Sequence, residues 1–350
     1  MRSLSAVALA GALVACTAAP TGSPPSSDGP SSPAESSAAS TNGHPSLSGR
    51  IIYSRFSGNA GWESDFLGSY IIQTDGSGEL PLPTPNHADT FLPNWSPDGM
   101  TVSVTVFDPA LDIFGRPAVL APDGSGFTML ETPGLAAIVQ CSDWSPDGAY
   151  LLCAYDDDER PQLEGIYEVG IDDLSVTRLT EAPYPSVVGT EGECGGGDYG
   201  ASYSPDGAQF AFIRMQCGVQ ADPSRDQRAA VWVGNSDGTG LMALTPAGMP
   251  HSHGPGVAWS PDGRWILFGD EGGDLNLVAP DLSGLTTITL DGPSGFAHTP
   301  TWSPDGQYIL FSMFADATGT TNLYIARPDG FEMRQVTTTL DVEAFADWGP

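Results

Sequence analysis

Three histidines stand where they could bind a metal ion together. His251 and His253 are two residues apart in the segment PHSHG, and His298 precedes a similar apolar stretch further along the chain. Residues two apart on an extended strand point to the same side, and imidazole nitrogens bind zinc and other transition metals well. The sequence therefore offers a divalent-metal site at these three residues. Ordinary hydrogen bonding between loop and strand is the alternative role for them.

Several expected loops carry clustered carboxylates. Ca²⁺ takes six to eight oxygen ligands, so a ring of such loops around a funnel could bind it. Solvated surface charge is the alternative interpretation. The acidic groups are Asp156 to Glu159, Glu191 with Glu193 and Asp198, and Asp270 with Glu271 and Asp274.

One serine-hydrolase pattern also occurs, and we interpret it as spurious. Residues 234–238 read GNSDG, which fits G-x-S-x-G. A nucleophile elbow needs a strand, a sharp turn and a helix, whereas this stretch has the composition of a β-turn between strands. We assign no catalytic residue and no cofactor-binding residue.

The charge of the chain excludes one class of partner. Among 350 residues there are 43 acidic and 12 basic side chains, every basic one is arginine, and the net charge is −31. Binding to nucleic acid requires clustered lysine and arginine to neutralise phosphates. We therefore expect no nucleic-acid partner.

A short motif repeats through the chain and indicates its architecture. WSPDG or YSPDG occurs at 95–99, 144–148, 203–207, 259–263 and 302–306, and an apolar strand follows each copy. Proline presets the second turn position, and glycine accepts the left-handed conformation that closes a hairpin. The marker aromatics are 49, 59, 56, 43 and 46 residues apart, counting Trp348 as the last. Such spacing is typical of four-stranded propeller blades.

The two ends of the chain complete the count. Residues 50–56 read as a strand that should follow a WSPDG turn, and residues 347–350 read as the start of a further repeat. We predict an all-β fold, a six-bladed β-propeller over 49–350 that is closed when the C-terminal strand joins the N-terminal blade. The marker aromatics are expected to be structural and to pack between blades: Trp95, Trp144, Tyr203, Trp259, Trp302 and Trp348.

The WSPDG repeats, each followed by a second turn containing DG and a terminal Leu-Thr, resemble the TolB-type propeller repeat. The resemblance covers about residues 49–350 and implies a periplasmic or surface protein whose propeller is a binding platform. Oligogalacturonate lyases, which are similar, use a histidine cluster at the channel for a metal. TolB itself carries a folded N-terminal domain where we expect a disordered tether in this chain, so the resemblance does not extend to TolB's role with its envelope partners.

The N-terminal region predicts export. Residues 1–15 contain one early arginine and a short apolar run, as signal peptides do, and the ending LVAC resembles a bacterial lipobox. The resemblance implies lipidation of Cys16 and a membrane anchor on the outer face of the cell membrane. Residues 16–48 are a tether rich in serine, proline and alanine, which we expect to be disordered. An ordinary signal peptide is the alternative.

The remaining cysteines form two symmetric pairs. Cys141 and Cys153 flank one turn, and Cys194 and Cys217 flank the next. Four cysteines allow three connectivities. Because an exported protein permits disulfides and cross-strand neighbours have a suitable spacing, we predict Cys141–Cys153 and Cys194–Cys217. Buried free thiols are the alternative.

Together these features favour a non-catalytic surface lipoprotein, a monomer that binds an envelope protein or glycan through its loop face. Trp62, Phe66 and Phe114 are the interface candidates, because aromatic side chains dominate binding energy; structural packing of the same residues is the alternative. The competing function is a metal-dependent polysaccharide lyase or hydrolase centred on the three histidines. A scaffold that spaces other components is a third interpretation.

Overall fold

The protein consists of β-strands arranged as radial sheets. The computed structural model describes residues 47–57, 66–85, 89–108, 113–136, 138–157, 159–182, 197–217, 227–249, 256–315 and 320–350. The helical element described in full within these ranges is a short 3-10 turn, Pro161–Leu163. The predicted all-β class is confirmed.

Four sheets each contain four antiparallel strands in chain order. The first is β4 (Asp89–Trp95), β5 (Val102–Asp108), β6 (Ile113–Leu120) and β7 (Thr128–Met129). The second is β8 (Ile138–Trp144), β9 (Tyr150–Asp156), β10 (Gly165–Gly170) and β11 (Val176–Arg178). The third is β12 (Gly197–Tyr203), β13 (Gln209–Cys217), β14 (Gln227–Asn235) and β15 (Met242–Ala243). The fourth is β16 (Val257–Trp259), β17 (Ile266–Gly269), β18 (Leu275–Val278) and β19 (Leu285–Ile288).

The fifth sheet joins the two ends of the chain. It contains β20 (Gly295–Trp302), β21 (Ile309–Ala315), β22 (Thr320–Ala326), β23 (Arg334–Gln335), β24 (Val342–Gly349), β1 (Arg50–Phe56), β2 (Phe66–Gln73) and β3 (Leu80–Pro81). The last strand, β24, pairs antiparallel with β1 along its length, and Ile51 lies opposite Trp348. In contrast, β22 and β24 share a single parallel pair, Thr321 with Val342. The predicted association of the two chain ends is therefore present.

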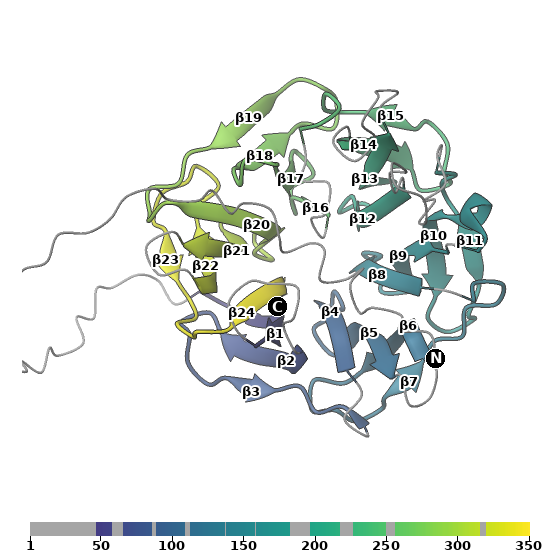
Figure 1. Cartoon of the computed structure of the whole chain (residues 1–350), viewed down its shortest axis with the longest axis horizontal. Helices are drawn as coiled ribbons and strands as arrows, with labels where there is room; N and C mark the ends of the chain where they lie inside the picture. The colour runs from purple at the N-terminus through teal and green to yellow at the C-terminus, as the bar shows by residue number, and fades with distance from the viewer. Residues whose placement is uncertain are drawn as a thin grey trace, which may run out of the picture.

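The sheets stand around a common centre (Figure 1), with β4, β8, β12, β16, β20 and β24 innermost. Each inner strand ends in a marker aromatic, and all six aromatics are buried, as predicted, at 4% to 8% exposure. The six hydrophobic clusters of the described residues contain one marker aromatic each. Trp259, for example, packs with Ile213 and Val231 of the preceding sheet as well as Phe268 of its own. The aromatics thus fill the space between neighbouring sheets.

The SPDG turn is held by its serine and aspartate together. In the third copy, Ser204 Oγ donates to Asp206 Oδ1 at 2.6 Å and accepts the N–H of Gln209 at 2.9 Å. The same carboxylate oxygen accepts the N–H of Ala208, and Gly207 takes the left-handed φ of 69°. The Ser204 hydroxyl holds the pKa of Asp206 below its usual value. Equivalent serine–aspartate bonds occur in the other four turns.

Strands extend into some of the predicted loops. The sequence predicts a loop over 215–228, but β13 and β14 pair from Gln209 with Asn235 as far as Cys217 with Gln227, so the segment between these strands is shorter than predicted. β6 likewise begins at Ile113 and β12 at Gly197. Residues with little strand propensity continue these ladders because their backbone groups find partners on the adjacent strand.

Replacing Ser204→Ala should lower the free energy of unfolding by about 1 to 3 kcal/mol, because it leaves the N–H of Gln209 without its acceptor. Urea unfolding of the purified protein measures this change. Ser236→Ala, at the backbone-bonded turn after β14, is the matched control, and its effect should stay within about 0.5 kcal/mol. Equal effects of the two variants would show that the serine hydroxyl does not stabilise the SPDG turn.

Candidate functional site

A cavity of about 90 Å³ lies where the inner strands meet. Its wall includes the residue that precedes each marker aromatic, so every inner strand contributes one position. This volume holds several water molecules. The six equivalent wall residues are Asn94, Asp143, Ser202, Ala258, Thr301 and Asp347.

Three of these side chains link one sheet to the next. Asp143 Oδ2 accepts the N–H of Tyr203 at 2.8 Å, and Asp347 Oδ2 accepts the N–H of Trp95 at the same distance. Ser202 Oγ accepts the N–H of Trp259 at 3.1 Å. In these three inner strands the side chain before the aromatic thus accepts the backbone N–H of the aromatic in the following sheet.

The two aspartates make the cavity acidic. Both side chains are partly exposed, and both line the cavity. Burial raises the pKa of Asp143 to about 7, and the negative charge of Asp347 acts in the same direction, against the N–H groups that Asp143 accepts. Burial also raises the pKa of Asp347. Two carboxylates that repel each other in a confined space favour a proton or a cationic group between them.

The backbone at the wall is strained. Leu92, Thr299 and Phe345 each lie three residues before a marker aromatic, and each has a positive φ between 50° and 56°. Side chains other than glycine rarely adopt this conformation, and such strain concentrates at functional sites. The ladder register shifts at the same places in β4 and β20. Glycines, Gly200 and Gly256, occupy the equivalent positions in two further strands.

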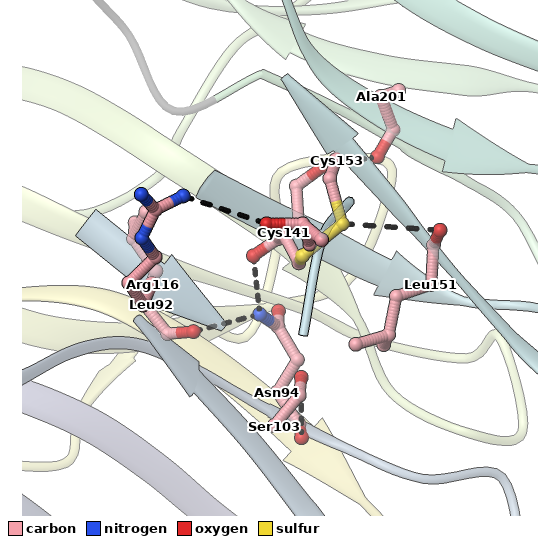
Figure 2. The surroundings of a disulfide bond; sticks show 10 residues. Leu92, Asn94, Ser103, Arg116, Cys141, Leu151, Cys153 and Ala201 are labelled. Atoms are coloured by element: carbon pink, nitrogen blue, oxygen red, sulfur yellow. Dashed lines mark hydrogen bonds between the residues drawn. A yellow bond between two sulfur atoms is a disulfide. The ribbon is translucent and has the colours of Figure 1, made fainter. Parts of the chain in front are cut away.

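In the remaining inner strand this position is Cys141, which forms a disulfide bond with Cys153, as predicted. Figure 2 shows the bond near Asn94, whose Nδ2 donates to the carbonyl oxygens of Leu92 and Cys141. The bond joins neighbouring strands of one sheet, β8 and β9. For the second predicted pair, Cys194 lies outside the described residues and Cys217 is described only at its backbone, so that pair stays a prediction.

Five phenylalanines cluster at the end of the sheets opposite the SPDG turns. Phe66 and Phe91 have ring centroids 4.2 Å apart, and Phe56, Phe107 and Phe345 contact this pair or each other at 5.0 to 6.2 Å. Four of them are partly exposed, and Phe345, which also lines the cavity, is buried. The strands β1, β2, β4, β5 and β24 bring them together. We call these five residues the phenylalanine cluster.

Among the interface candidates, Phe66 therefore belongs to the phenylalanine cluster, one member of which, Phe345, lines the cavity. Phe114 is on β6, with its backbone opposite Phe107, and its side chain is outside the description. Trp62 lies outside the described residues.

The acidic loops use several of their carboxylates in internal ion pairs. Asp198 binds the Arg214 guanidinium through two oxygens, at 2.6 and 2.7 Å, and both side chains are buried. Asp157 pairs with Arg160 at 2.8 Å. The Asp270 carboxylate accepts N–H groups from Gly272 and Asp274 within its own turn. In the described part of the chain no three histidine, cysteine, aspartate or glutamate side chains group as metal ligands.

The histidine site cannot be assembled from the described residues. His298 lies on β20 opposite Ser312, is 8% exposed, and has its ring 6.2 Å from that of Phe296. His251 and His253 fall outside the described residues, so the three-histidine metal site stays a prediction. Across the described ranges there is also no helix long and apolar enough to cross a bilayer.

The buried carboxyls predict a pH-dependent stability. The unfolded pKa of Asp143 is near 3.8 and the folded value about 7, so the folded protein binds more protons in this window. The free energy of unfolding should therefore fall as the pH rises from about 4 to 7, by at most about 1.4 kcal/mol per pH unit for this group. Asp347 contributes in the same direction. Asp98 and Asp147, two SPDG aspartates whose pKa is lowered, affect the free energy of unfolding only below this window.

Urea unfolding between pH 4.5 and 7.5 tests this expectation. Asp143→Asn should flatten the slope without removing the part due to Asp347, whereas Asp172→Asn, at an exposed aspartate, should leave it unchanged. Parallel slopes for Asp143→Asn and the wild-type protein would contradict the assignment.

Removing the disulfide should also destabilise the fold. The double variant Cys141→Ala, Cys153→Ala is expected to lose roughly 2 to 4 kcal/mol, the usual contribution of such a bond. Thermal unfolding without reductant measures it, and treatment of the wild-type protein with reductant is the comparison. If Cys194 and Cys217 are also bonded, reduction will lower the Tm of the double variant further. An unchanged Tm in the double variant would show that this bond does not stabilise the fold.

No protein-family model matches the chain. No curated protein matches it in sequence. Solved structures do resemble it. TolB from Acinetobacter baumannii superposes with a TM-score of 0.61 at 20% identity, over 87% of this chain and 67% of that one. A putative TolB from Agrobacterium tumefaciens gives 0.54 at 18%, over 87% and 100%. A chain of a nidogen/laminin complex gives 0.60 at 9%, over 86% and 99%. The fold of this protein is accordingly that of the TolB-like β-propellers.

Proposed function

We propose that this protein is a non-catalytic binding platform outside the cytoplasm, anchored to the outer face of the cell membrane by a lipid on Cys16. Its propeller binds another envelope protein through the phenylalanine cluster. The observation that carries the proposal is the phenylalanine cluster itself. Its five aromatic side chains lie beside the acidic cavity, whose wall has a strained backbone.

We further propose that the ring has six blades closed by β24. The eight-stranded sheet is counted as two blades because β22 and β24 share one residue pair, whereas β24 and β1 are paired from Arg50 to Phe56. The bond from Trp95 N–H to Asp347 supports closure, since it joins β24 to the sheet of β4. It is the same contact that Tyr203 N–H makes with Asp143 between two other sheets.

The start of the propeller supports the proposed orientation on the membrane. Trp348 Nε1 donates to Ser48 O at 3.1 Å, and Arg50 lies within 3.5 Å of the carbonyl of Gly99 in an SPDG turn. The predicted tether would therefore leave from the SPDG side. Its roughly 30 residues span about 30 Å as a flexible coil. The phenylalanine cluster at the opposite end would then face away from the membrane.

Phenylalanine favours a protein partner over a glycan. Its side chain has no group that can pair with sugar hydroxyls, whereas apolar side chains of another protein can pack against it and displace water. Partly exposed aromatics that lie close together are typical of interface hot spots. The adjacent carboxyls Asp143 and Asp347 would attract a lysine or arginine of the same partner.

Phe66→Ser in the full-length, membrane-bound protein should reduce the recovery of crosslinked envelope partners by about tenfold, because a hot-spot aromatic contributes more than 1 kcal/mol. The measurement is quantitative mass spectrometry of proteins that copurify with the tagged chain. Met100→Ser, a 68% exposed residue beside an SPDG turn, is the matched control on the opposite side. Equal partner recovery from the two variants, both with normal thermal unfolding, would reject the phenylalanine cluster as the binding site.

A further inference from the structure

The outer strand β19 is an open sheet edge. It is the last strand of its sheet, and no other described strand pairs with its outer side. It has four residues, against two or three in each of the other described outer strands: β3, β7, β11, β15 and β23. Leu285, Thr286 and Thr287 are exposed. A long exposed edge is a template for pairing with another chain, and most proteins shorten or cover such edges.

The register of β19 shows which backbone groups are available. Ala279 N–H bonds to Gly284 O at 2.8 Å, and β18 and β19 continue antiparallel from that pair. Hydrogen-bonded pairs alternate along an antiparallel ladder, so Thr286 and Ile288 direct their backbone groups to β18. The N–H and C=O groups of Leu285 and Thr287 therefore point outward.

A groove runs along the same edge. Its volume is about 360 Å³, and its wall consists of residues 286–291 on one side and Pro328, Asp329 and Phe331 on the other. The second wall is the turn between β22 and β23, and Asp291 N–H bonds to Gly330 O at 3.0 Å where the two walls meet. Phe331 is 60% exposed. An incoming strand would thus find both open backbone groups and an aromatic surface.

The turn is fixed firmly against the strand. The Asp291 carboxylate accepts the N–H groups of Glu332 and Met333, both at 3.2 Å. A Cβ on Gly330 would lie 1.9 Å from Thr289 O, so only glycine allows this approach. The groove is therefore a built feature of the junction between two sheets, with rigid walls.

The acidic residues of the groove favour a basic ligand. Asp291 and Asp329 line it, and Glu332 follows in the same turn; Arg327 forms ion pairs with Asp329 at 3.9 Å and with Glu332 at 4.0 Å, so the acidic groups outnumber this one arginine. The chain's own tether has no lysine or arginine between residues 17 and 48, and a second copy carries the same charge of −31. Charge complementarity thus disfavours both and favours a basic segment of a different protein.

We propose that β19 binds a basic, extended segment of a partner protein by strand addition. The backbone of the segment pairs with Leu285 and Thr287, one apolar side chain packs on Phe331, and its lysine or arginine residues lie near Asp291 and Asp329. Main-chain bonds supply affinity in such complexes, and alternate side chains supply specificity. This second surface is separate from the phenylalanine cluster.

A capped peptide of about seven alternating lysine and valine residues is the probe. It should bind the full-length protein and slow amide hydrogen exchange at Leu285 and Thr287. The same peptide with N-methyl groups on the amides that face β19 keeps its charge and should bind at least tenfold more weakly. A glutamate–valine peptide should not bind. Failure of the lysine–valine peptide to bind, or equal binding of the N-methylated form, overturns the proposal.

Protein variants locate the site. Thr287→Pro removes an outward N–H and should weaken peptide binding at least tenfold, while Val176→Pro, at an outward-facing position of β11, should not. Asp329→Asn should weaken binding several-fold, and more so at low salt. Phe66→Ser should leave peptide binding unchanged. The test of strand addition at β19 is therefore independent of the test of the phenylalanine cluster. Binding unaffected by Thr287→Pro would place the peptide elsewhere and reject strand addition at β19.

Discussion

The architecture depends on how each inner strand holds the next sheet. A marker aromatic fills the space between two sheets, and in three of the six inner strands the side chain just before it accepts the backbone N–H of the aromatic in the following sheet, as Asp143 does for Tyr203. The two contacts are adjacent in sequence, so one short motif carries both the apolar packing and the polar link. Asp347 makes the same link to Trp95 across the chain ends. Neighbouring sheets are thus joined by repeated local contacts.

Two of the side chains that link neighbouring sheets are aspartates, and both lie at the wall of the central cavity. Aspartate is a strong acceptor for a backbone N–H, but placing two aspartates on one narrow wall brings two negative charges together. Burial is the main cause of the raised pKa of Asp143 and of Asp347, and at Asp143 the charge of Asp347 adds to it. Left-handed residues such as Thr299 and Phe345 add backbone strain at the same level. The cavity wall therefore combines contacts between sheets, carboxyl groups with raised pKa values and strained backbone.

Local patterns predicted local structure well. The sequence predicted four features: the SPDG turns, the buried aromatics, the Cys141–Cys153 bond and the meeting of the chain ends. Each of them depends on neighbours in sequence or on a fixed repeat. The wall aspartates carried a signal that was overlooked, since they directly precede the marker aromatics. No sequence pattern indicated the phenylalanine cluster, because Phe56, Phe91 and Phe345 come together only when three strands that are distant in sequence are placed side by side. The pairing of Asp198 with Arg214 also carried a signal, since the two residues lie opposite each other on consecutive strands, β12 and β13.

The position of β1 also has a mechanical consequence. This strand is flanked on both sides, by β24 and β2, and its two ends lie at opposite faces of the ring. A pull applied between residue 49 and the far face would run along β1 and load both of its ladders in shear. Inter-strand hydrogen bonds are perpendicular to that direction, so they would have to break together and could not open one at a time. The first strand of the domain is therefore placed to resist tension along its own length.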